Sequence, residues 1–130
     1  MTDPRDLHLL VGWGSMAAGA LSGAAIGLFF HQDGWLGGYG SFRRRMLRLG
    51  HIAFFGLGIL NVLFAVSIAA RPSESSLLPL ASAGFWMAAV TMPACCFLTA
   101  WRKELRHLFP IPVLALVAGI AGLMAGWVPR

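Results

Sequence analysis

Four continuous apolar stretches dominate this sequence of 130 residues. They cover residues 7–30, 52–70, 77–100 and 109–128. A helix needs about 20 apolar residues to cross a hydrocarbon core that is about 30 Å thick. The sequence therefore predicts an all-α, polytopic membrane protein that folds as a compact antiparallel bundle of four transmembrane helices. Because the connecting segments are short, we expect residues 1–130 to form a single integral membrane domain.

The composition supports a lipid environment. Hydrophobic residues make up 58% of the chain and charged residues only 12%, whereas an average soluble domain is about 25% charged. These values exclude a disordered chain, a collagen-like repeat and an ordinary soluble enzyme. The segment before the first stretch holds Asp3, Arg5 and Asp6, whereas a secretory signal begins with a positive segment. We therefore expect the first stretch to be retained as a transmembrane helix.

The basic residues predict the orientation in the membrane. Seven of them lie in the loops at 31–51 and 101–108, and the other three are Arg5, Arg71 and Arg130. Cytoplasmic loops carry the excess of Lys and Arg, so both termini are predicted to face outward. With no transit peptide, the expected location is a bacterial inner (plasma) membrane. This asymmetry explains the net charge of +5 without a nucleic-acid partner. The arginines expected to contact lipid head groups are Arg43, Arg44, Arg45 and Arg48.

Small residues recur at every fourth position of the first and last stretches. Between membrane helices, small residues let the backbones approach closely. We expect these rows to line contacts within the bundle, or contacts with other membrane subunits or a second copy of the chain. The glycines concerned are Gly19, Gly23, Gly27, Gly122 and Gly126.

Three histidines are predicted at the cytoplasmic ends of the helices: His31, His51 and His107. Two histidines at matched depth on facing helices can ligate a haem iron, so haem b is the candidate cofactor. The alternative is that these side chains are interfacial anchors. Asn61 shares a broad helical face with His51. It is expected either to hydrogen-bond across helices or to contact a cofactor or a permeant.

A second candidate site consists of soft ligands in the third stretch. Met92 and Cys96 are four residues apart, and His107 follows about three helical turns after Cys96 on the same face. Thioether and thiolate ligands suit copper(I). The alternative is ordinary core packing, because methionine fills gaps and free cysteine behaves as a small hydrophobe.

The ionisable residues limit the possible functions. The apolar stretches contain no carboxylate, which disfavours a carboxylate-driven antiporter. No spacing of Ser, Cys, His and Asp predicts a nucleophilic site, so no catalytic residue is assigned and the chain is expected not to be an enzyme. The favoured function is a non-catalytic accessory or assembly subunit of a larger membrane complex, such as a respiratory complex. The alternatives are an electron-transfer subunit that binds b-type haem or a metal, and a small oligomeric channel or carrier.

Overall fold

The computed structural model describes residues 3–70 and 75–127. This part of the chain is helical and contains no strand. It forms four long helices and two 3-10 turns: α1 (Pro4–Leu28), η1 (Trp35–Gly37), α2 (Phe42–Ala70), α3 (Leu78–Trp101), η2 (Lys103–Leu108) and α4 (Pro110–Ala125). Four helices are long and apolar enough to cross a membrane, and the fourth of them joins η2 and α4. The predicted all-α class with four such helices is confirmed.

Helix α2 begins at Phe42, ten residues before the apolar stretch at 52–70. The backbone N–H of Arg44 donates to the Ser41 hydroxyl over 3.2 Å, so Ser41 caps the helix. The arginine-rich segment is therefore the first part of α2.

Three residues named in the sequence analysis lie outside the described residues: Arg71 of the predicted second loop, Val128 of the predicted fourth span, and Arg130 at the C-terminus.

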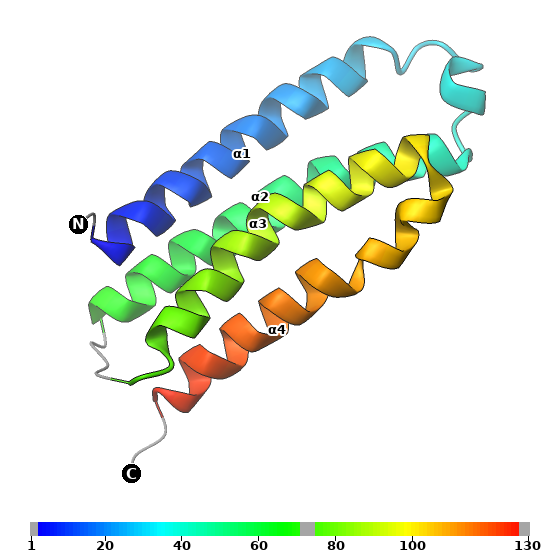
Figure 1. The fold of residues 1–130 in the computed structure, drawn as a ribbon. Coiled ribbons are helices and arrows are strands. Elements are labelled where there is room, and N and C mark those ends of the chain that lie inside the picture. The colour runs from blue at the N-terminus through cyan, green and yellow to red at the C-terminus, as the bar shows by residue number, and fades with distance from the viewer. Residues whose placement is uncertain (1–2, 71–74, 128–130) are drawn as a thin grey trace.

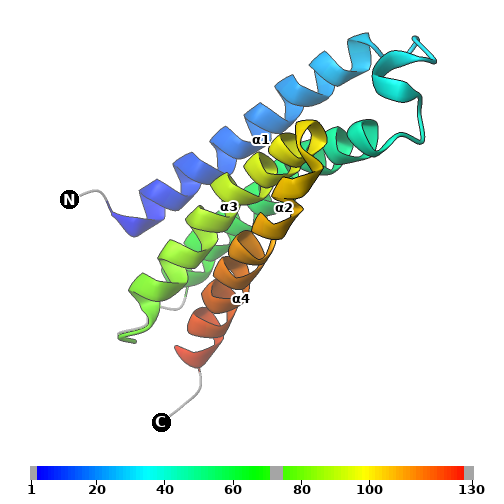
Figure 2. The same ribbon diagram turned by 45° about the vertical axis from the view of Figure 1, so that its right-hand side comes forward.

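The four helices run antiparallel in sequence order, and α1 and α4 lie on opposite sides of the α2–α3 pair (Figures 1 and 2). Within the described residues, α3 contacts α1, α2 and α4, whereas α1 and α4 do not contact each other. Half of the most apolar segment of α3 is buried, against 11% for α1 and 17% for the last helix. The molecule therefore has a central helix, α3, and two flanking helices, α1 and α4.

Two pairs of glycines mark the closest approaches between helices. A Cβ atom added to Gly12 of α1 would lie 2.8 Å from the carbonyl oxygen of Gly58 on α2, and the reverse distance is the same. A Cβ added to Gly84 of α3 would lie 2.7 Å from Cα of Gly119 on α4. At both crossings the neighbouring backbone fills the space that a larger residue would need.

The glycine rows predicted from the sequence differ in their surroundings. Gly19 faces the Phe55 ring, Gly23 faces the His51 ring, and Gly122 faces Ala81 of α3, so these three lie at contacts within the chain. No atom lies within 4 Å of the Cβ position of Gly27. Gly126 is the C-cap of α4.

The space between α2 and α3 is filled by two small clusters of buried side chains. One contains Leu57, Ala88 and Ala89, and the other contains Phe64, Ala81 and Phe85. Leu116 of α4 packs against both. These clusters form the apolar core between α2 and α3.

Candidate functional site

A buried polar cluster joins α1, α2 and α3. It contains His8 and Asn61, which have no exposed surface, and the part-buried Ser82. Nδ1 of His8 lies 2.7 Å from Oδ1 of Asn61, and Nε2 of His8 lies 2.8 Å from Oγ of Ser82. The His8 ring also packs on Phe64, with 4.4 Å between ring centroids. One imidazole therefore connects three helices.

The hydrogen bonds determine where the protons lie. Nδ2 of Asn61 donates to the carbonyl oxygens of Leu57 (2.9 Å) and Phe85 (3.2 Å), so Oδ1 must be the amide atom that faces His8. Since Oδ1 can only accept, Nδ1 of His8 carries a hydrogen. In the neutral ring Nε2 is then an acceptor, and the Ser82 hydroxyl donates to it.

Asn61 forms two interhelical hydrogen bonds, to His8 of α1 and to Phe85 of α3, as one of its two predicted interpretations requires. Asn61 and His51 both face α1, but they bond to different parts of it. The cluster was not predicted, because His8 lies 53 residues from Asn61 and 74 from Ser82. The sequence predicts no nucleophilic site, whereas the structure places the hydroxyl of Ser82 beside the His8 ring. The available signal was His8 itself, since an ionisable residue inside an apolar helix usually has a specific partner.

A shallow groove of about 280 Å³ opens beside Ser82. Its lining is otherwise apolar and comes from the beginnings of α1 and α3, which lie at the same end of the molecule (Figure 1). The lining residues are Pro4, Leu78, Pro79, Ser82, Ala83 and Trp86. The serine of the cluster is thus reachable from outside, while His8 and Asn61 lie behind it.

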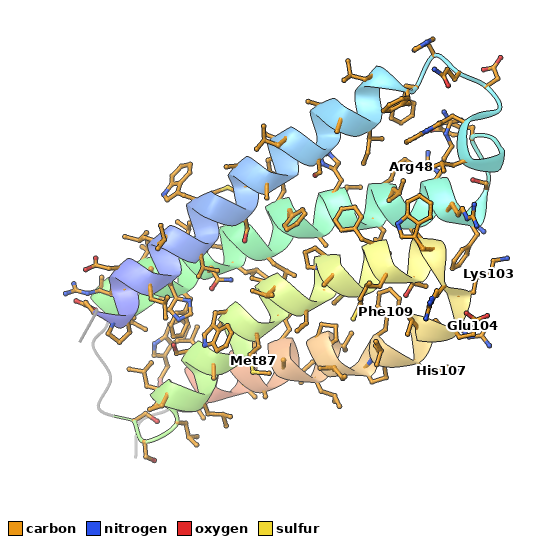
Figure 3. All side chains as sticks on the ribbon, turned by 45° about the horizontal axis from the view of Figure 1, so that its top comes forward. Arg48, Met87, Lys103, Glu104, His107 and Phe109 are labelled. Carbon is orange, nitrogen blue, oxygen red and sulfur yellow. The ribbon has the colours of Figure 1, made fainter. Side chains whose placement is uncertain are left out.

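The three histidines predicted to bind haem have different surroundings. His51 donates from Nδ1 to the Gly19 carbonyl over 2.7 Å, and its ring lies against Gly23. His31 lies in the turn after α1 and His107 lies on η2, and both are exposed. Figure 3 shows His107 with Lys103 at the end of the molecule where α2 carries Arg48. The haem site therefore stays a prediction.

Met92 and Cys96 occupy packing positions on α3. Met92 packs against the cluster that contains Leu57. Cys96 is fully buried, and its Cβ lies 3.2 Å from where a Cβ on Gly50 would be. Over the described ranges, no three His, Cys, Asp or Glu side chains are grouped so that they could hold a metal ion.

Arg44 differs from the other arginines predicted to contact lipid head groups. Its side chain is only 3% exposed, and it donates to the carbonyl oxygens of Gln32 (3.1 Å) and Asp33 (3.5 Å). The guanidinium also lies over the rings of Phe30 and Trp35. Arg44 therefore holds the α1–α2 loop together, and little of its surface is left for a lipid head group. Arg43 and Arg45 are exposed, and Arg48 lies over Tyr39.

The loop that Arg44 fastens has an unusual backbone. Leu36, Gly37 and Gly38 have φ angles of 54°, 90° and 93°. The left-handed region is readily adopted by glycine, whereas it costs a residue such as leucine about 1–2 kcal/mol. The contacts of Arg44 with the part of the loop before Leu36 offset this cost.

We expect Arg44→Ala to lower the free energy of unfolding by about 1–3 kcal/mol, because its charge-assisted hydrogen bonds to the carbonyls of Gln32 and Asp33 are lost. Limited proteolysis should then cut the segment between α1 and α2 faster than in the unmodified protein. The control is Arg45→Ala, which removes an exposed arginine from the next position. Equal proteolysis rates in both variants would contradict the role of Arg44.

Comparison with protein-family models, curated proteins and solved structures finds no match to this chain.

Proposed function

We propose that this chain is a small accessory or assembly subunit of a larger membrane complex, in which residues 1–130 act as one integral membrane domain. The supporting observation is the arrangement of α1 and α4 on opposite flanks of the α2–α3 pair. Both flanks present large apolar side chains outward. The most exposed are Leu10, Leu21 and Leu28 on α1 and Leu114, Val117 and Met124 on α4. A chain with two such faces can contact two neighbouring membrane proteins at once.

The hydrogen bonds of the polar residues in the helices favour a subunit over a channel formed by one copy of the chain. Asn61 uses its amide for bonds to His8, Leu57 and Phe85. The hydroxyl of Thr91 donates to the carbonyl of Met87 in the same helix over 2.7 Å. These polar groups therefore bond to protein atoms, so few of them are free to bind a permeant. A conducting path would have to form between several copies.

The proposed location is the bacterial inner membrane, with both termini outside and the loops at 31–51 and 101–108 in the cytoplasm. The seven basic residues of these loops support this orientation, and Figure 3 shows Arg48 and Lys103 at one end of the molecule. A phosphatase fused after Arg130 is expected to be active, whereas a fluorescent protein fused there should be dark. A fluorescent C-terminal fusion would contradict this orientation.

The subunit function is tested by site-specific crosslinking in intact membranes. A photoreactive residue is placed at Leu21 on α1 or at Leu114 on α4, which are 73% and 65% exposed. The control is Tyr39, which is 65% exposed but lies in the α1–α2 loop. We expect a discrete crosslinked product with another membrane protein from at least one flank. Crosslinks to lipid alone from both flanks would refute the proposal. Crosslinks only to a second copy of the chain would show a homo-oligomer instead of a subunit of a larger complex.

The haem alternative is tested on the protein purified in detergent. A difference spectrum, reduced minus oxidised, is expected to show no Soret band if the chain is a cofactor-free subunit. A Soret band that disappears in His51→Ala would make electron transfer the function instead.

A further inference from the structure

We propose that Ser82, His8 and Asn61 form a nucleophilic site that cleaves acyl esters with an apolar chain. This inference is independent of the proposed subunit function, because it rests on hydrogen-bond geometry inside one copy of the chain. It requires three things: a base beside the serine, a group that fixes the base, and space for the substrate.

The base is His8. Its Nε2 lies 2.8 Å from Oγ of Ser82, within the range for proton transfer. The hydrogen on Nδ1 leaves the lone pair of Nε2 directed at the serine hydroxyl. This is the tautomer that a general base needs, and serine and cysteine hydrolases use the same order of nucleophile, imidazole and orienting group.

Asn61 is the positioning residue. Its Oδ1 accepts from Nδ1 of His8 over 2.7 Å, and this bond persists whether the ring is neutral or protonated. The amide cannot rotate freely, because Nδ2 is held by the carbonyl oxygens of Leu57 and Phe85. Phe64 packs on the ring and limits its movement further.

The substrate class follows from the groove beside Ser82. The groove holds about 280 Å³ and is lined by Leu78, Pro79 and Trp86 among others, so it suits an alkyl chain. It lies where α3 begins, and the positive end of a helix dipole favours the negative charge that develops on an attacked carbonyl.

The reaction balances without a further reagent except water. Oγ of Ser82 bonds to the carbonyl carbon of the ester, and its proton moves to Nε2 of His8. The bond to the leaving alcohol breaks, and that alcohol takes the proton from His8. Water then attacks the acyl serine and gives a proton to Nε2, which returns it to Oγ as the carboxylic acid leaves.

The chain contains a matched control pair in Ser22 and His51. Nδ1 of His51 lies 3.3 Å from Oγ of Ser22, but it donates to the Gly19 carbonyl over 2.7 Å. Ser22 itself donates to the same carbonyl over 3.0 Å. This serine therefore has a histidine beside it without having a base.

The test uses an alkyl fluorophosphonate, which reacts with activated serines, on the full chain in detergent micelles. Mass spectrometry of the digested protein is expected to locate one adduct on Ser82. His8→Gln should slow this labelling by about 100-fold or more, because general-base catalysis contributes that much. Ser22→Ala and His51→Gln should leave the rate unchanged. Absence of an adduct on Ser82, or an equal rate in a helical, monodisperse His8→Gln, would show that the cluster is only structural.

A second measurement applies if His8→Gln does not fold. Ser82→Cys and Ser22→Cys are alkylated with iodoacetamide over a range of pH, and each site is quantified separately from Cys95 and Cys96. A thiolate paired with His8 should keep its reactivity below pH 7, whereas an ordinary thiol loses about tenfold per pH unit below its pKa of about 8.5. Parallel pH profiles at the two positions would overturn the proposal.

Discussion

Replacing Gly84 by alanine is expected to lower the free energy of unfolding by about 1–3 kcal/mol, as overpacked interiors do. The added Cβ would collide with the carbonyl oxygen of Ala115 and lie 2.7 Å from the backbone of Gly119. These are backbone atoms, so no side-chain rotation can relieve the contact and α3 must move away from α4. Reversible unfolding in mixed micelles, followed by circular dichroism, measures the loss.

The matched control is Gly56→Ala in α2. No atom lies within 4 Å of the Cβ position of Gly56. Since alanine favours a helix over glycine by about 1 kcal/mol, this variant should be as stable as the original protein or more stable. A similar loss in both variants would mean that helix flexibility, and not the crossing with α4, explains the effect of Gly84→Ala.

Asn61→Leu is expected to cost about 1–3 kcal/mol, the penalty for leaving buried polar groups without partners. His8 loses its acceptor, and the carbonyl of Phe85 loses its donor. Removing both members of the pair should be less damaging than the single changes suggest. The double variant His8→Phe with Asn61→Leu should therefore be more stable than the sum of the two single losses predicts, by about 1 kcal/mol.

Thr91→Val is the control for these single and double variants. The hydroxyl of Thr91 bonds to Met87 in its own helix and joins no second helix. Its removal should change the stability by about 0.5 kcal/mol or less. Strict additivity of the His8 and Asn61 changes would show that the two side chains do not stabilise each other.

The helices were predictable because the length of an apolar stretch is a property of each segment alone. The ten residues before residue 52 carry four arginines, as a cytoplasmic loop does, but Ser41 ahead of them is a residue that caps helices. Arginine is nevertheless a good helix former, and the Ser41 cap lets α2 begin at Phe42. Charge therefore indicated which end of the molecule this segment occupies, and local propensity decided that it is helical.

The buried cluster could not be predicted in the same way. The sequence places Asn61 and His51 on one broad face of a helix, and both residues face α1. Which residue of α1 meets Asn61 depends on how α1 and α2 are rotated where Gly12 crosses Gly58, and the apolar pattern of each helix does not determine that rotation. The same limit applies to Arg44, whose partners are carbonyl groups of the preceding loop.

The absence of contact between α1 and α4, within the described residues, has a consequence for how the chain folds. Contacts that are close in sequence form quickly, because little loop entropy is lost. Here α1 and α2 can form a hairpin through their own contacts, and α3 then supplies Ser82 and the Phe85 carbonyl as partners of His8 and Asn61. No step has to wait for the last helix to close a ring. The helices can therefore pack in the order of their synthesis, with α4 docking last, through Leu116 and Gly119, onto a surface that α2 and α3 already form.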